Sequence, residues 1–150
     1  MCGICGISPS DHRTPDVQLL DQMTKAILHR GPDSDGFHTE PGIGLGMRRL
    51  AIIDVEGGDQ PITNEDESLW IIFNGESHNF PELYSDLVKK GHEFRTRSDT
   101  ECILHLYEEY GDDCVTHLRG QAAFALWDRR NKKLLLARDR MGKKDRKSVV

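Results

Sequence analysis

The chain has 150 residues, a length that suits one domain built around one hydrophobic core. Hydrophobic residues make up 37% of it and charged residues 30%, which is a globular composition and not a disordered one. The net charge of −5 argues against a surface for nucleic acid or anionic membrane, and no apolar run approaches the ~20 residues that span a bilayer. The four cysteines are too few and too scattered for a disulfide scaffold, so we expect a reduced, cytoplasmic protein.

The first third of the chain predicts two strands separated by a helix and a loop. Residues 2–8 read as a short buried strand, and residues 15–30 as an amphipathic helix because apolar residues recur at near-helical spacing. Residues 29–36 have the Gly, Pro, Asp and Ser content of a loop. Residues 42–54 predict a strand that ends in a turn near Gly57.

The continuous apolar run at residues 69–73 predicts a strand buried on both faces. Asn79 is expected to cap a helix that starts at Phe80 and ends near Gly91.

Ser98 and Glu101 match the capping-box pattern at the start of a second helix, residues 101–110. Residues 124–128 and 134–138 predict a hairpin. Helices therefore lie outside a sheet core in the layered fold that we expect.

Cys2 directly follows the initiator methionine, and three interpretations of it are open. It could be a buried strand residue, or one half of a redox or zinc pair with Cys5. In a strand, however, positions i and i+3 point to opposite faces with Cα atoms ~10 Å apart, and no second CxxC pair completes a zinc shell. The third interpretation is a catalytic nucleophile at the first position of the mature chain.

Removal of Met1 would leave an α-amine and a thiol on the same residue. Such an amine has a pKa of ~7.7–8.0, close enough to neutrality to act as the base for the thiol of Cys2. A nucleophile and its base would then lie within one residue.

Asn74, Gly75 and Glu76 supply the other groups that acyl transfer needs. The Asn side chain and the Gly backbone N–H can both donate to a developing oxyanion, and Glu76 adds a negative charge. The alternative is a polar turn that ends the strand.

Arg49 and Asp99 are candidate substrate ligands. Arg49 lies in a mostly apolar stretch, where it needs a carboxylate partner: either an internal ion pair or a substrate carboxylate. Asp99 at a helix N-terminus could be explained by the helix dipole alone, or could bind an ammonium group together with Glu76. Glu101 and His105 share a helix face, and we favour an ordinary i,i+4 pair over a metal site there.

Seven short motifs occur in one order along the chain. They are CGICG at 2–6, HRGPD at 29–33, RLAIID at 49–54, NGE at 74–76, SDTE at 98–101, FALWD at 124–128 and ARDR at 137–140. This combination resembles the class II glutamine amidotransferase domain, in particular the N-terminal glutaminase half of glutamine-hydrolysing asparagine synthetases. The resemblance covers residues 2 to about 144.

The resemblance implies an α+β fold, the four-layer αββα sandwich of N-terminal-nucleophile hydrolases. It implies hydrolysis of L-glutamine to glutamate and ammonia through a thioester on Cys2, with the oxyanion held by Asn74 and Gly75. Arg49 would bind the α-carboxylate of glutamine, and Glu76 and Asp99 its α-amino group. No metal or organic cofactor is implied for this half-reaction.

The resemblance stops near the C-terminus. Residues 1–144 are expected to form an incomplete amidotransferase domain, and residues 145–150 are a tail that does not match. The synthetase part, to which ATP and Mg²⁺ would belong, is absent from this sequence, so a separate synthetase domain or chain is an expected partner. The alternative function is a truncated, inactive remnant that still binds glutamine.

Two further departures lie inside the domain. The segment Ser77-His78-Asn79 stands where the family usually reads Ile-Tyr-Asn, so Ser77 and His78 are polar in place of larger, more apolar residues and we expect altered loop packing. Gln121 and Ala122 replace the family's Met and Phe, so we expect a core that lacks an aromatic ring and holds a buried glutamine.

Overall fold

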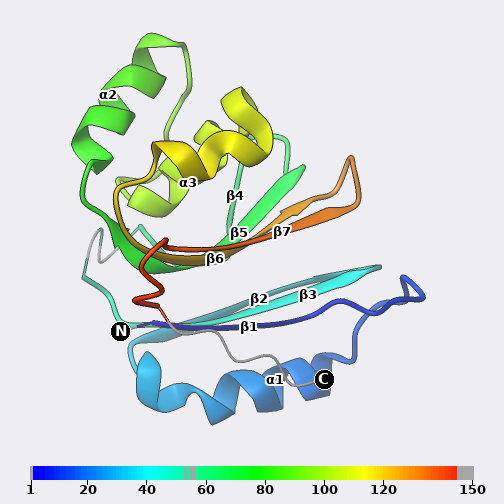
Figure 1. Ribbon diagram of the computed structural model, residues 1–150. Helices are drawn as coiled ribbons and strands as arrows, with labels where there is room; N and C mark the ends of the chain where they lie inside the picture. The colour runs from blue at the N-terminus through cyan, green and yellow to red at the C-terminus, as the bar shows by residue number, and fades with distance from the viewer. Residues whose placement is uncertain (1, 53, 55–56, 145–150) are drawn as a thin grey trace.

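The computed structural model describes residues 2–52, 54 and 57–144 (Figure 1). Its elements in chain order are β1 (Gly3–Ile7), α1 (Val17–Ala26), the 3₁₀ helix η1 (Leu28–Arg30), β2 (Ser34–Glu40), β3 (Ile43–Arg49), β4 (Ile62–Thr63), β5 (Leu69–Ser77), α2 (Phe80–Lys89), α3 (Asp99–Tyr110), the 3₁₀ helix η2 (Gly111–His117), β6 (Gly120–Asp128) and β7 (Lys133–Arg138).

Two antiparallel sheets are stacked in the middle of the molecule. One has the strand order β1-β3-β2, and the other has the order β4-β5-β6-β7. Helix α1 covers the outer face of the first sheet, and α2 and α3 cover the outer face of the second (Figure 1). This is the four-layer αββα sandwich that the sequence predicts.

Each sheet buries apolar side chains because both of its faces are covered. The cluster between the sheets consists mainly of Ile43, Leu45, Met47, Ile72, Ala125 and Trp127. The cluster between the second sheet and its helices includes Ile71, Phe73, Leu104, Phe124 and Leu126. Alternate residues of β5 and β6 thus enter different clusters, which explains their nearly continuous apolar sequence.

The helix starts follow the capping residues more closely than the apolar periodicity. The Asp16 carboxylate accepts hydrogen bonds from the N–H groups of Gln18 and Leu19, so α1 begins at Val17 and not at residue 15. Ser98 accepts from the N–H of Thr100 at the start of α3, as predicted.

Two capping predictions are wrong in their details. The Glu101 carboxylate accepts from the N–H groups of Arg95 and Thr96. In a capping box it would instead accept the backbone N–H of Ser98. Asn79 occupies the N-cap position of α2 but makes no capping hydrogen bond with its side chain.

The polar segment at the end of β5, residues 77–79, is held by several hydrogen bonds. The Asn79 amide donates to the carbonyl of His117 and accepts from the N–H of Arg119. The Ser77 hydroxyl donates to the side-chain oxygen of Asn79, and the backbone N–H of His78 donates to the carbonyl of Arg119. These hydrogen bonds, made mainly by Asn79, tie the segment to the end of η2 and to the residues that follow it.

Three strand predictions need correction. Residues 34–40 form strand β2, where part of this stretch reads as loop, and β4 is a two-residue strand that the sequence does not signal. Strand β3 ends at Arg49, so residues 50–52 are not strand; Ile53 lies outside the described residues. The predicted non-matching tail, residues 145–150, also lies outside them.

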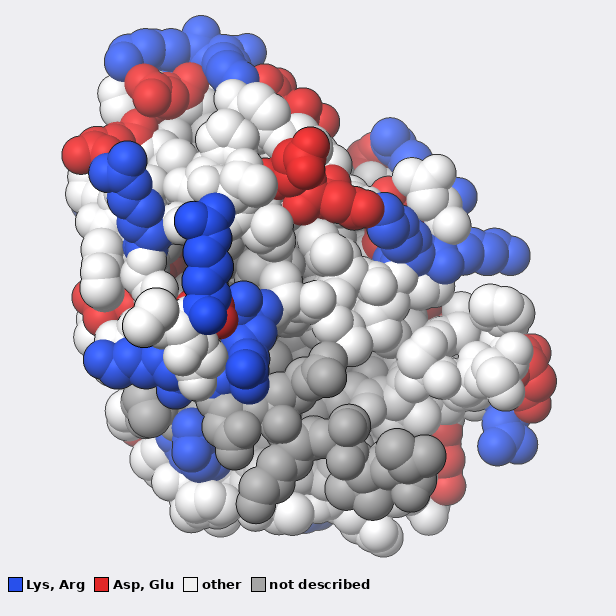
Figure 2. Space-filling view, in the orientation of Figure 1, with Lys and Arg blue, Asp and Glu red and all other residues white. Residues whose placement is uncertain are grey.

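Acidic and basic side chains are interspersed over α2 and α3 on the face that Figure 2 shows. This mixture fits the small net charge. Among the described residues, no helix is both long and apolar enough to cross a membrane.

Candidate active site

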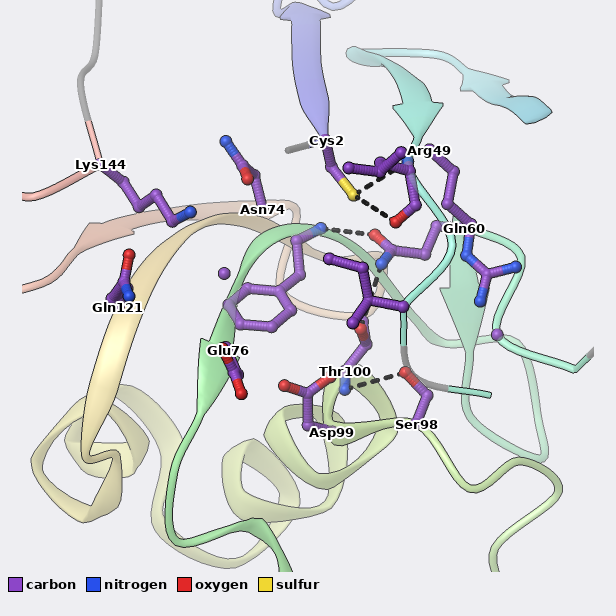
Figure 3. A pocket seen from close by; sticks show the side chains of 15 residues that line it. Cys2, Arg49, Gln60, Asn74, Glu76, Ser98, Asp99, Thr100, Gln121 and Lys144 are labelled. Atoms are coloured by element: carbon purple, nitrogen blue, oxygen red, sulfur yellow. Dashed lines mark hydrogen bonds between the residues drawn. The ribbon is translucent and has the colours of Figure 1, made fainter. Parts of the chain in front are cut away.

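All of the predicted site residues line one cavity of about 140 Å³ at the same end of both sheets (Figure 3). Cys2 precedes β1, Arg49 ends β3, the triplet 74–76 lies near the end of β5, and Asp99 begins α3. The sandwich thus brings residues from four separate segments to one place.

The thiol of Cys2 lies against the backbone of Leu50. It donates to the Leu50 carbonyl over 3.6 Å, and the N–H of Leu50 donates back to Sγ over 3.4 Å. Cys5 faces the other way, with its Sγ 3.3 Å from the hydroxyl of Thr24 on α1. Cys2 and Cys5 form no disulfide, and their sulfur atoms contact different partners, which argues against a redox pair.

Asn74 and Gly75 lie inside β5, so the turn interpretation of this triplet is wrong. Asn74 pairs with Ala123 of β6, and Gly75 pairs with Ala122. A side chain at Gly75 has no space, because a Cβ there would lie 2.1 Å from the carbonyl oxygen of Gln121. Close packing against β6 therefore requires glycine at this position, whether or not a substrate also approaches the backbone there.

Glu76 and Asp99 place two carboxylates at the cavity. Asp99 is buried, with 4% of its surface exposed, and its Oδ2 accepts the N–H of Ser77 over 2.9 Å. Burial raises the pKa of the Asp99 carboxyl, and the negative charge of Glu76 adds to this rise. A positively charged group between these carboxylates would relieve the cost of keeping both ionised.

Arg49 forms the internal ion pair that was one of its two interpretations. Its Nη1 lies 3.0 Å from Oδ1 of Asp59, and its Nη2 donates to the carbonyl of Asp54 over 2.6 Å. Arg49 is 5% exposed and still lines the cavity, whereas the Asp59 side chain is 64% exposed. The second interpretation, a substrate carboxylate as partner, stays a prediction.

Gln60 is a cavity residue that the sequence did not signal. Its Oε1 accepts the N–H of Phe73 over 2.6 Å, and its Nε2 donates to the hydroxyl of Thr100 over 3.1 Å. Gln60 therefore links β5 to the start of α3, the two elements that carry most of the polar site residues. No spacing rule finds it, because its partners lie 13 and 40 residues away.

Lys144 and Gln121 also line the cavity (Figure 3). Lys144 is 6% exposed; burial and, secondarily, the positive charge of Arg30 lower the pKa of its ammonium group. Gln121 is half-buried and faces the cavity, so the prediction of a glutamine buried in the core is wrong.

A family model and curated proteins similar in sequence point to the same kind of protein. The family model described as glutamine amidotransferase domain matches residues 1–145. Asparagine synthetase [glutamine-hydrolyzing] 1 of Bacillus subtilis (strain 168) is 46% identical over 145 residues, which cover 95% of this chain and 23% of that protein. Asparagine synthetase [glutamine-hydrolyzing] of Zea mays is 46% identical over 143 residues, which cover 95% of this chain and 24% of that protein. The chain thus spans about a quarter of the length of these curated relatives.

Solved structures support the fold. Glutamine phosphoribosylpyrophosphate amidotransferase from B. subtilis is 19% identical with a TM-score of 0.66, over 92% of this chain and 36% of that one. The allosteric regulatory enzyme of purine biosynthesis is 24% identical with a TM-score of 0.54, over 66% of this chain and 24% of that one. These neighbours share the predicted fold, the four-layer αββα sandwich. With a family match over nearly its whole length and this fold, the chain belongs to the glutamine amidotransferase domain family.

Proposed function

We propose that this chain hydrolyses L-glutamine to glutamate and ammonia, with Cys2 as the nucleophile. The observation that carries the proposal is the convergence of a thiol, an amide, a guanidinium and two carboxylates on one cavity. Each of these groups matches one part of glutamine or of its reaction.

In the first step the sulfur of Cys2 attacks the side-chain amide carbon of glutamine. The α-amine of Cys2, freed by removal of Met1, takes the thiol proton and passes it to the departing nitrogen. The C–N bond breaks as ammonia leaves, and a γ-glutamyl thioester remains. Water then hydrolyses the thioester and restores the thiol. Met1 itself lies outside the described residues.

The backbone of Leu50 fixes the position of the Cys2 thiol, since its N–H donates to Sγ and its carbonyl accepts from it. Lys144 lines the same cavity as Cys2.

The remaining groups would bind and polarise the substrate. Asn74 and the N–H of Gly75 would hold the oxyanion of the tetrahedral intermediate. Arg49 would hold the α-carboxylate, and the carboxylate pair Glu76 and Asp99 the α-ammonium group. As proposed, the hydrolysis draws all of its reacting groups from this chain and takes no cofactor.

We also propose that the ammonia serves asparagine synthesis in the cytoplasm. The support is the name shared by the curated relatives, of which this chain covers about a quarter. The ATP- and Mg²⁺-dependent step would then belong to a synthetase domain or to a separate synthetase chain.

The test is the intact mass of the protein after incubation with a diazo-ketone analogue of glutamine. We expect the mass of Met1 to be absent and one adduct to form on Cys2, blocked by excess L-glutamine. Cys2→Ala should take no label, and the matched control Cys5→Ala should label like the wild type.

The same experiment separates the alternative, a domain that binds glutamine without turnover. A protein that binds L-glutamine in calorimetry but takes no glutamine-protected label would support that alternative. Retention of Met1 would contradict the proposed mechanism, because the α-amine would then not be free.

A further inference from the structure

A second cluster of polar side chains lies in the outer helix layer, apart from the glutamine cavity. It consists of His92, which follows α2, and of His105 and Glu108 on α3. One ligand atom from each of the three lies within 4.8 Å of the others. None of them lines the cavity at Cys2.

The positions of the three side chains are fixed by the local fold. His105 and Glu108 are three residues apart on one helix, so they share a face. The C-terminus of α2 ends in a Schellman motif: Gly91 has a φ of +98°, its N–H donates to the Val88 carbonyl, and the N–H of His92 donates to the Leu87 carbonyl. This motif turns the chain so that His92 comes to lie against α3.

Both imidazoles direct Nδ1 at the same carboxylate oxygen. Oε2 of Glu108 lies 2.8 Å from Nδ1 of His105 and 3.3 Å from Nδ1 of His92. Its other oxygen accepts from the side-chain amide of Asn64 over 2.8 Å, which holds the carboxylate in place. Donor atoms bound tetrahedrally to zinc at ~2.0–2.1 Å lie roughly 3.3 Å from one another. The two distances from Oε2 of Glu108 to the Nδ1 atoms are close to this value.

The second ring nitrogen of each imidazole, Nε2, points away from Glu108 and faces another carboxylate. Nε2 of His92 lies 3.1 Å from Oε1 of Glu109, and Nε2 of His105 lies 3.9 Å from Oε1 of Glu101. Histidines that bind a metal commonly donate their other N–H to such a carboxylate. Within the described part of the chain, Nε2 of His105 is buried and has no hydrogen-bond partner. A metal on Nδ1 would put the proton on this orphaned nitrogen and point it at Glu101.

The charges around the cluster also favour a cation. Three carboxylates, Glu101, Glu108 and Glu109, face the two imidazoles, and Lys90 supplies one positive charge at 2.6 Å from Glu109. With neutral imidazoles these groups sum to −2, which one divalent ion would balance. The side chain of His105 is 1% exposed, and those of His92 and Glu108 are 15% and 25% exposed, so solvent can supply a fourth ligand.

We propose that His92, His105 and Glu108 bind one zinc ion, or a similar borderline divalent ion such as cobalt. Two imidazole nitrogens and one carboxylate oxygen suit these metals better than Mg²⁺ or Ca²⁺, which prefer oxygen ligands alone. The ion would fasten the segment after α2 to α3, and it is separate from the proposed glutamine chemistry.

The test is a titration of the chelator-treated full chain with Co²⁺, followed by visible absorption, and with Zn²⁺ in competition with a chromogenic chelator. We expect one equivalent to bind, with a Co²⁺ spectrum that lacks a sulfur-to-cobalt charge-transfer band. His92→Asn and Glu108→Gln should weaken binding by more than ~100-fold. Glu109→Gln, which removes the negative charge beside Nε2 of His92 together with the ion pair to Lys90, should weaken it ~10–100-fold.

Two controls exclude other ligands. His12→Asn replaces an exposed histidine whose φ of +56° asparagine tolerates, and it should bind metal like the wild type. Cys2→Ala should also retain the ion, which separates this site from the thiol. Circular dichroism should show that every variant is folded. Binding that persists in His92→Asn, or a folded wild type that takes up no metal, would overturn the proposal.

Discussion

The side-chain amide of Asn74 faces the cavity from the middle of a strand, a position where most residues are apolar. Among the described residues it makes no hydrogen bond, so removing it deprives no other group of a partner. We therefore expect Asn74→Ala to keep its melting temperature but to lose ~10²- to 10³-fold in kcat, the usual cost of one oxyanion donor. Release of ammonia from glutamine measures the rate. Near-normal turnover would remove Asn74 from the mechanism.

Asp99 is a residue at which function and stability are expected to oppose each other. Its folded-state pKa is raised above the ordinary value of 3.8, so the folded protein holds the proton more tightly than the unfolded chain. The contribution of Asp99 to stability consequently falls as the pH rises from 3.8 through the folded-state pKa, and it stays lost at neutral pH.

Asp99→Asn keeps an oxygen for the N–H of Ser77 and removes the buried charge. At pH 7 we expect it to be at least as stable as the wild type in urea denaturation. Its kcat/KM for glutamine should fall by ~30-fold or more, since removing one partner of a buried charge pair costs at least ~2 kcal/mol. The control Asp86→Asn changes an exposed carboxylate on α2 and should alter neither quantity. A variant that is destabilised yet fully active would contradict both arguments.

Residue chemistry makes some parts of the site visible in the sequence and hides others. Arg49, Asn74 and Asp99 stand out because a polar group in an apolar strand, or an acid at a helix start, requires a reason. Gln60 and Lys144 give no such signal, since each lies in a polar stretch of the chain. Their burial follows only from tertiary packing, which single-sequence patterns do not contain.

At the scale of elements, apolar runs and capping residues locate most strands and the helices, whereas the polar edge strand β2 and the two-residue strand β4 escape. Strand β2 has the sequence SDGFHTE, pairs only with β3 and exposes alternate residues, so it resembles a loop in composition. Strand β5 continues past Phe73 because β6 pairs with it as far as Ser77. Pairing across the sheet, and not local propensity, sets that end.

Ala122 of β6 is the position at which the sequence predicts an aromatic ring to be missing from the core. Ala122 packs on the helix side of the sheet and lines a cavity of about 350 Å³, together with Phe73, Ile103, Leu118 and Phe124. The opposite face of β6 is closely packed, since Ala125 lies in the cluster between the sheets.

Ala122→Phe should therefore stabilise the protein. Filling a cavity typically contributes ~0.5–2 kcal/mol, and each kcal/mol raises the Tm of a domain of this size by ~2–4 °C. Calorimetry measures the change. The matched control Ala125→Phe places the same ring between the sheets, where overpacking should cost ~1–3 kcal/mol. Equal effects of the two substitutions would show that the two faces of β6 do not differ in packing.

At the scale of the whole molecule, the cavity proposed to bind glutamine joins layers that otherwise meet through apolar packing. Its walls come from Cys2 just before β1 and Arg49 of β3 at one sheet, from β5 and β6 of the other, and from α3 of the outer helix layer. A ligand in this position would contact three of the four layers, so its binding free energy adds to the stability of the whole sandwich.

We accordingly expect L-glutamine to raise the Tm of the Cys2→Ala variant, which binds substrate but cannot consume it. At a concentration of ~100 times Kd the gain is ~2.7 kcal/mol. That gain corresponds to a rise of roughly 5–11 °C for a domain of about this length. Differential scanning calorimetry over a range of glutamine concentrations measures the rise.

D-Glutamine is the matched ligand control. It carries the same groups but cannot present its α-ammonium to the carboxylate pair, its α-carboxylate to Arg49 and its side-chain amide to position 2 at the same time. The double variant Cys2→Ala/Asp99→Asn should lose most of the rise, because half of the proposed ammonium site is missing. If D-glutamine raised the Tm as much as L-glutamine, the cavity would not be the stereospecific site that its charge arrangement predicts. A rise that survived unchanged in the double variant would place the bound ligand away from Asp99.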